Sequence, residues 1–108
     1  MITRFHDGMH FLLASAPHAD TFGYSMPPPG LLRLGGELLA RGVEVQLEDL
    51  AFHLASGSLP EATDLAESCA EHLLARSPAV LGLSVMGATL PVALLIAEHV
   101  RRCAPDVP

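Results

Sequence analysis

Residues Val80 to Pro108 read VLGLSVMGATLPVALLIAEHVRRCAPDVP, which predicts an apolar strand, a short loop and an amphipathic helix. An earlier stretch, Pro27 to Leu50, reads PPPGLLRLGGELLARGVEVQLEDL and predicts a helix followed by a strand that ends at Asp49. Alternating helices and strands are typical of a doubly wound α/β sheet, in which ligands bind beyond the strand ends. The sequence therefore predicts a parallel sheet with a binding site at one edge.

The beginning of the chain supplies a further strand. Phe11 to Ser15 is almost wholly apolar and is soon followed by Pro17, as expected of a central strand covered on both faces. His18 to Pro29 predicts a long irregular loop, because glycine, serine and three consecutive prolines interrupt any regular pattern. With strand two at the edge, the predicted order is 2-1-3, as in flavodoxin-like and Rossmann-like sheets.

The helix predicted over Gly30 to Arg41 ends at Gly42. We expect its inner face to hold Leu31, Leu34, Leu38 and Leu39, and its outer face to carry an i, i+4 ladder of Arg33, Glu37 and Arg41. Gly35 and Gly36 lie inside this helix and would permit close packing on the sheet, at some cost in helix propensity. Val43 to Asp49 alternates apolar and polar residues, which predicts an edge strand less fully covered than its neighbours.

The second half of the chain continues the pattern. Phe52 to Leu59 is interpreted as a linker, and Ser58 to Glu61 matches a capping box that would open a helix running to about Arg76. Ala79 to Ser84 is another apolar strand, and Thr89 with Pro91 would open the last helix. The expected inner residues are Ala62, Leu65, Ala66, Cys69 and Leu73 in the first of these helices, and Ala93, Ile96, Ala97 and Val100 in the second.

Composition excludes several classes of function. The net charge is -6, with six arginines and no lysine, so the basic surface of a nucleic-acid binder is missing. The chain contains no run of about 18 apolar residues, and its N-terminus does not resemble a signal peptide. We therefore expect a cytoplasmic protein that contacts neither nucleic acid nor membrane. Cys69 and Cys103 lack metal-binding spacing and are expected to be buried or half-buried thiols.

The end of the chain suggests a domain cut short. Ala104 to Pro108 has the pattern that leads into another buried strand, yet no residues follow to form it. We expect a fragment with three strands of about five. In this interpretation residues 1–10 are an N-terminal extension, and residues 11–108 form three β/α units of one domain.

The predicted site lies between strands one and three, where the order of the strands reverses. Its loops carry Ser25, Ser84 and Thr89, and Asp49 borders the same edge. Neither a nucleophile with its base nor a His/carboxylate pair occurs in these loops, so binding is better supported than catalysis. A structural role is also open, because Ser84 and Thr89 are suited to a strand end and a helix cap, and Asp49 to a loop start.

These residues resemble the N-terminal cobalamin (vitamin B12)-binding domain of B12-dependent radical SAM enzymes. The resemblance spans Phe11 to Pro108 and rests on the Pro-rich loop with PPPGLLRLGGELLARG, on VEVQLEDL, and on the strand PAVLGLS that leads to Thr89. B12-binding domains often end strand three with Ser-x-Leu. Here Ser84-Val85-Met86 is similar, with Met in place of Leu.

The resemblance implies a corrin ring across the strand ends, with Ser84 near the benzimidazole of the nucleotide tail. The implied cofactor-binding residues are Tyr24, Ser25, Met26, Asp49, Ser84, Val85, Met86 and Thr89. A downstream radical SAM domain, outside this chain, would bind the [4Fe-4S] cluster and S-adenosylmethionine and would carry out methyl transfer or a radical rearrangement. The chain itself would be non-catalytic.

The histidines do not suggest a metal ligand. B12 mutases carry Asp-x-His-x-x-Gly after strand one, whereas this loop reads His18-Ala19-Asp20-Thr21-Phe22-Gly23, so His18 is not expected to ligate cobalt. His6 and His10 are spaced i, i+4, but Gly8 and the terminal position disfavour the helix that a metal pair would need. The remaining three, His53, His72 and His99, are interpreted as solvated helix or linker residues.

Two alternatives share this sheet order. A signalling receiver domain would need acidic residues after strand one and an aspartate at the end of strand three, where this chain has Ser15-Ala16-Pro17 and Ser84. A nucleotide-binding domain would need a Gly-rich turn between strand one and its helix, and no GxGxxG occurs. A Rossmann-like nucleotide- or sugar-nucleotide-binding half-domain of a transferase is the stronger alternative, because such folds also begin with a strand and a long loop.

Overall fold

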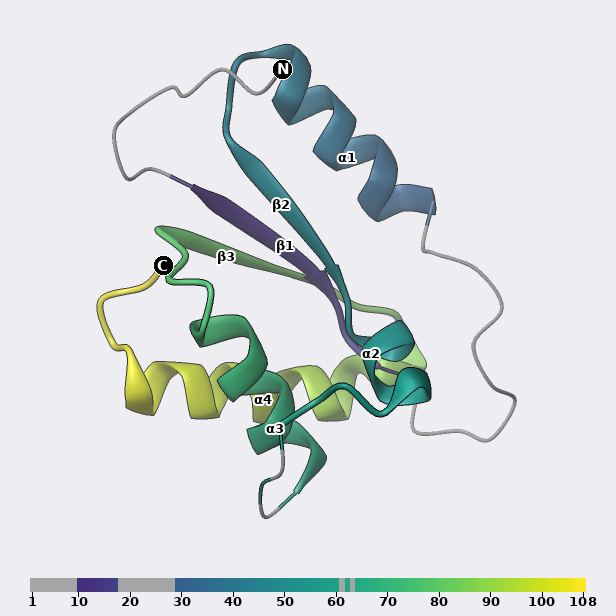
Figure 1. Cartoon of the computed structure of the whole chain (residues 1–108), viewed down its shortest axis with the longest axis vertical. Coiled ribbons are helices and arrows are strands. Elements are labelled where there is room, and N and C mark those ends of the chain that lie inside the picture. Colours follow the sequence, from purple (N-terminus) through teal and green to yellow (C-terminus); the bar gives the residue numbers. More distant parts are fainter. Residues whose placement is uncertain (1–9, 18–28, 61, 63) are drawn as a thin grey trace.

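The computed structural model describes residues 10–17, 29–60, 62 and 64–108. A parallel sheet of three strands is flanked by helices (Figure 1). The elements are, in chain order, β1 (Phe11–Ser15), α1 (Pro29–Ala40), β2 (Val45–Asp49), α2 (Leu50–Ser56), α3 (Leu65–Leu74), β3 (Val80–Ser84), the short 3-10 turn η1 (Gly87–Thr89) and α4 (Leu90–Cys103).

The sheet has the predicted order, β2-β1-β3, and all neighbouring strands are parallel. β1 is central, because its residues pair with β2 on one side and with β3 on the other. On the outer edge of β3, the Leu81 N–H donates to the Pro108 carbonyl at 3.0 Å, and Figure 1 places the C-terminal residue beside the start of β3. The α/β class and the flavodoxin-like order are confirmed.

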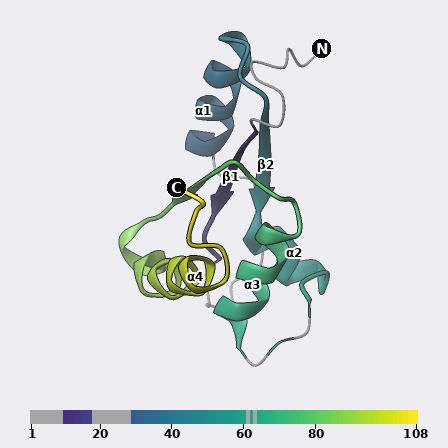
Figure 2. The ribbon, with the colours of Figure 1, turned by 90° about the vertical axis from the view of Figure 1, so that its left-hand side faces the viewer.

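The side chains of the sheet divide the core into two layers. On one face, Leu12 and Ala14 of β1 pack against α2, α3 and α4 in a cluster completed by Leu50, Ala66, Cys69, Ala70, Leu73, Ile96 and Val100. On the other face, Leu13 packs against α1 in a smaller cluster with Leu31 and Val45. Figure 2 shows α4 nearly end-on, with α3 beside it and α1 well separated from both.

The inner face of α1 differs from the prediction. Leu31 is buried and Leu38 half-buried, but Leu34 and Leu39 are 50% and 42% exposed. The contact with the sheet is instead made at Gly35, where an added Cβ would lie 2.9 Å from Leu47 Cδ2. The α1 backbone therefore approaches β2 closely at one glycine.

The surface of α1 and its end agree with the prediction. Glu37 and Arg41 form an exposed i, i+4 ion pair at 2.7 Å. Gly42 follows the helix with φ 79°, a left-handed conformation that glycine adopts without steric cost. The glycine at this position therefore ends the helix and turns the chain toward β2.

The predicted linker after β2 is wrong, because these residues form α2. The Asp49 carboxylate accepts from the Phe52 N–H and caps the start of α2, and Gly57 ends it with φ 72°. Asp and Gly at these two positions are typical helix-ending residues. A helix of only seven residues is too short to show a clear helical periodicity in the sequence.

The predicted capping box at Ser58 to Glu61 is also wrong as the start of α3. The helix begins at Leu65, where the Asp64 carboxylate accepts from the Glu67 N–H at 2.8 Å. Ala62 is exposed and lies before the helix. The helix end is close to the prediction, since α3 finishes at Leu74.

The last helix has the predicted position. Ala93, Ile96 and Val100 are buried as expected, but Ala97 is exposed. Burial raises the pKa of the Cys69 thiol to about 11. Cys103 is exposed at the end of α4, which corrects its predicted burial. None of the helices in the described part of the chain combines the length and apolar character needed to cross a bilayer.

Candidate functional site

Three polar side chains line up at the carboxyl end of the sheet and form the strand-end row. In the strand register, Ser15 of β1 is the partner of Asp49 in β2 and of Ser84 in β3. The Ser15 hydroxyl donates to Asp49 Oδ1 at 3.4 Å. The fold thus brings together Asp49 and Ser84, two of the residues expected at the site, with Ser15 between them.

One carboxylate oxygen of Asp49 lacks a hydrogen-bond partner among the described residues. Its Oδ1 accepts from Ser15 and from the backbone N–H of Phe52, so it both joins the row and caps α2. Its Oδ2 is buried and has no hydrogen-bond partner in the part of the chain that the structure describes. Since a buried polar atom without a partner costs free energy, Oδ2 is a ready acceptor for a donor supplied by a ligand.

Beyond Ser84 the chain presents an apolar lip. Ser84 is exposed, and Val85 and Met86 follow it with 43% and 65% of their surface exposed. Thr89 is buried, and its hydroxyl accepts from the Met86 N–H at 2.9 Å. Thr89 therefore shapes this turn from beneath, as a capping role would require, while Val85 and Met86 face outward.

Several expected residues lie outside the described part of the chain. These are the loop residues Tyr24, Ser25 and Met26, together with His6 and His18. His10 is described, and its Nε2 is buried without a hydrogen-bond partner within the described ranges. Its carbonyl accepts from the Ala79 N–H at 2.9 Å beside the start of β3.

A second polar cluster was not predicted. The Glu48 carboxylate lies on the α3 side of β2 and is 6% exposed. Its Oε2 is 2.8 Å from His53 Nε2 and 3.0 Å from His72 Nε2, and its Oε1 accepts from Arg76 Nε. Elements β2, α2 and α3, together with Arg76 just beyond α3, each contribute to this Glu48 cluster.

The surroundings of Glu48 stabilise its ionised form. Burial opposes ionisation of Glu48, but hydrogen bonds from His72, Arg76 and His53 and the charge of Arg76 outweigh it, so the pKa of Glu48 is lowered. Arg76 also donates through Nη1 to the His72 carbonyl at 2.8 Å. On the far side of its ring, His53 Nδ1 lies 2.8 Å from the Ser58 hydroxyl. Gln46 Nε2 also donates to Glu48 Oε1 at 3.0 Å, so Glu48 is an ionised carboxylate held by four side chains.

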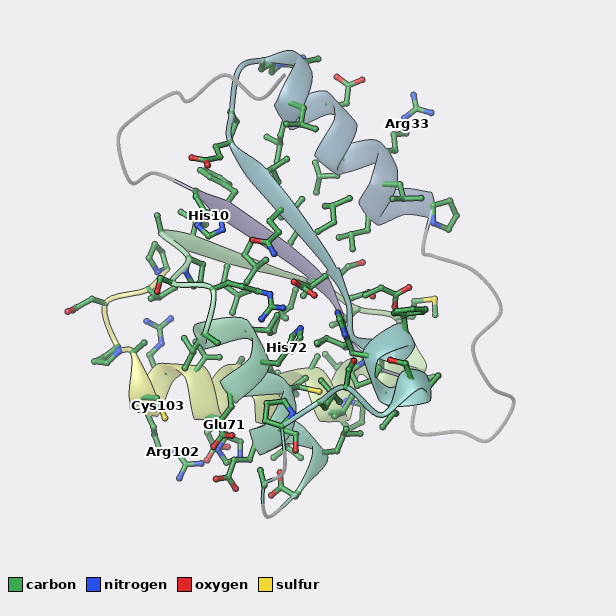
Figure 3. The ribbon with its side chains drawn as sticks, in the orientation of Figure 1. His10, Arg33, Glu71, His72, Arg102 and Cys103 are labelled. Atoms are coloured by element: carbon green, nitrogen blue, oxygen red, sulfur yellow. The ribbon has the colours of Figure 1, made fainter. Side chains whose placement is uncertain are left out.

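The prediction of solvated histidines is wrong for His72, which is buried. Figure 3 shows His72 between α3 and the sheet, while Glu71 and Arg102 extend from the outer surface. His53 and His99 are half-buried, and His99 Nε2 lies 3.9 Å from Asp64 Oδ1. Helical spacing contained the signal, since His72 and Arg76 follow Leu65 at i+7 and i+11 and follow Cys69 at i+3 and i+7.

The sheet order makes this a flavodoxin-like α/β domain. Ser15, Asp49 and Ser84 form a polar row at the carboxyl ends of its strands. No family model, curated protein or solved structure matches the chain.

Proposed function

We propose that this chain binds cobalamin across the carboxyl ends of β1 and β3, as the corrinoid-binding module of a B12-dependent radical SAM enzyme. The observation that carries the proposal is the β2-β1-β3 order, which places the reversal of strand order beside Ser84. Ligands of open parallel sheets bind at such a reversal. The sequence resemblance gives the corrinoid as the ligand.

The chemistry of the strand ends fits such a cofactor. A corrin ring is a large, flat, mainly apolar macrocycle with amide groups around its rim. Val85 and Met86 supply exposed apolar surface, and Met in particular adapts its shape to a partner. Asp49 Oδ2 supplies a buried acceptor for an amide N–H. Together they support a ring laid over the lip with one edge near β2.

The module would hold and orient the cofactor rather than react. A radical SAM domain elsewhere in the polypeptide would bind the [4Fe-4S] cluster and S-adenosylmethionine, and cobalamin when bound would supply methyl-transfer or radical chemistry. In this proposal the partners are the corrinoid and that domain, and the location is cytoplasmic. The contribution of the present residues is to position one face of the ring.

One observation favours a second candidate, a nucleotide- or sugar-nucleotide-binding half-domain of a transferase. The N-terminus of α4 lies at the same strand ends, directly after η1. Backbone N–H groups at such a helix start attract phosphate. The missing Gly-rich turn counts against this candidate, because a phosphate needs close approach to the backbone.

The test is a spectroscopic titration of the full-length protein with hydroxocobalamin, followed by separation from free ligand. We expect the corrinoid spectrum to co-elute with the protein. Ser84→Tyr places bulk at the strand end and should weaken binding at least about ten-fold. Ala40→Tyr adds the same bulk at the exposed end of α1, at the opposite edge of the sheet, and should not change binding.

Absence of hydroxocobalamin uptake by the full-length protein would reject the proposal. Equal weakening by Ser84→Tyr and Ala40→Tyr would place the corrinoid elsewhere. Uptake of ATP or a UDP-sugar without uptake of hydroxocobalamin would favour the nucleotide-binding candidate.

A further inference from the structure

The Glu48 cluster has the composition of a metal site. Glu48 Oε2, His53 Nε2 and His72 Nε2 lie within 4.8 Å of one another and come from three separate elements. Two imidazole nitrogens and one carboxylate oxygen are a common ligand set for Zn²⁺ with an open fourth position. We propose that Glu48, His53 and His72 bind a divalent transition-metal ion of the zinc type.

Two of the three ligand separations require only a small adjustment. Zinc binds imidazole nitrogen and carboxylate oxygen at about 2.0–2.2 Å, which separates tetrahedral ligand atoms by about 3.3 Å. The present distances from Glu48 Oε2 are 2.8 Å to His53 Nε2 and 3.0 Å to His72 Nε2. An opening of about half an ångström at these two contacts would give the separation that the ion needs, and the ligand atoms of His53 and His72 lie within 4.8 Å of each other.

The surroundings already orient the ligands. A metal-bound His53 carries its proton on Nδ1, and Ser58 Oγ lies 2.8 Å from that atom as an acceptor. Arg76 holds Glu48 Oε1, which leaves Oε2 directed at the two imidazoles. Such contacts outside the ligand set fix orientation and tautomer, as they do in established zinc sites.

Burial and charge determine how a metal ion would enter the site and how tightly it would bind. The side chains of Glu48 and His72 are 6% and 8% exposed, whereas that of His53 is 22% exposed, so an ion would enter past His53. A water molecule would complete the coordination on that side. Arg76 places a positive charge next to the site, and we expect this to limit the affinity relative to a site without a cation.

The site is separate from the proposed corrinoid cradle. The cradle involves the strand-end row and the Val85–Met86 lip, whereas Glu48 points to the α3 side of β2. The two proposals can therefore fail independently.

The experiment titrates metal-free full-length protein with Zn²⁺ against a chromophoric chelator. We expect one ion per chain at this site. Removing a ligand in His53→Gln should weaken binding by at least about ten-fold, the smallest effect seen even for residues that only support ligands. His10→Gln and His99→Gln remove histidines outside the cluster and should leave the affinity unchanged.

A second measurement guards against loss of fold. Zn²⁺ should raise the thermal unfolding temperature of the parent protein, because an ion that binds only the folded chain stabilises it. The rise should be absent in His53→Gln, whose unfolding temperature without metal should stay near that of the parent because His53 is partly exposed. No zinc uptake by the parent, or equal uptake by His53→Gln, would overturn the proposal.

Discussion

At the scale of single residues, Glu48 is a buried carboxylate that joins three elements. It alternates with Leu47 along β2, so the strand turns one side chain to α1 and the next to α3. Because α3 covers the polar side of this edge strand, Glu48 is buried rather than solvated. The free energy of that burial is offset by His72, His53 and Arg76.

Replacing Glu48 by Gln should therefore destabilise the fold. A Gln amide keeps the shape but loses the charge and cannot accept from all four side-chain partners, so we expect a loss on the order of 2 kcal/mol at neutral pH. The measurement is urea unfolding with a chelator present. Glu37→Gln, which breaks only the exposed pair with Arg41, should cost less than about 1 kcal/mol.

The pH dependence of this difference has a defined sign. The pKa of Glu48 is lowered from its ordinary value of 4.5, so the stabilisation is fully present above that value and is lost as pH falls through the folded-state pKa. The difference in free energy of unfolding between the parent and Glu48→Gln should become smaller below about pH 4.5. A difference in unfolding free energy that grows as the pH falls would contradict this account of the Glu48 cluster.

At the scale of elements, α1 is rich in leucine but buries only Leu31 and Gly35. Its contact with β2 depends on the missing side chain of Gly35, against which the end of Leu47 rests. Gly36, the next residue, has open space where a Cβ would lie. The two glycines therefore form a matched pair.

Gly36→Ala should stabilise the protein by about 0.5–1 kcal/mol, because alanine is the better helix former and meets nothing. Gly35→Ala should be less stable than Gly36→Ala by about 1 kcal/mol, since Leu47 must move to avoid the new methyl group. Denaturant unfolding of both variants measures the difference. Equal stabilisation would show that α1 can shift away from β2 without loss.

At the scale of the whole molecule, the two core layers are unequal. The layer beneath α3 and α4 holds Leu12, Leu50, Leu73 and Ile96, each fully buried, whereas the α1 layer has few buried side chains. On α4 the same helix also carries exposed leucines, with Leu94 61% exposed. Stability should therefore depend on the inner row of α4 and hardly on its outer row.

Ile96→Ala should cost about 2–4 kcal/mol, through lost burial and the cavity left behind. Leu94→Ala on the same helix should change stability by less than about 0.5 kcal/mol. Both changes in the free energy of unfolding are measured from the midpoints of urea unfolding at constant m-value. Similar losses in the two variants would mean that the outer face of α4 is covered by another surface.

The sequence itself determined the α/β class, the three strands and the order in which they pair. Continuous apolar runs in β1 and β3 and clean alternation in β2 are local signals, because the two faces of a strand are read directly from residue spacing. Two of the expected site residues, Asp49 and Ser84, follow from the same spacing, since strand ends converge at one edge of a parallel sheet.

Only the tertiary structure decided what the polar residues do. Whether Glu48 meets water or His72 depends on where α3 lies over β2, and no local pattern encodes that distance. The short helix α2 likewise depends on a cap by Asp49 and on packing of Leu50 in the core. Spacing within an element is fixed by backbone geometry, whereas contacts between elements are fixed by packing, and the Glu48 cluster belongs wholly to the second kind.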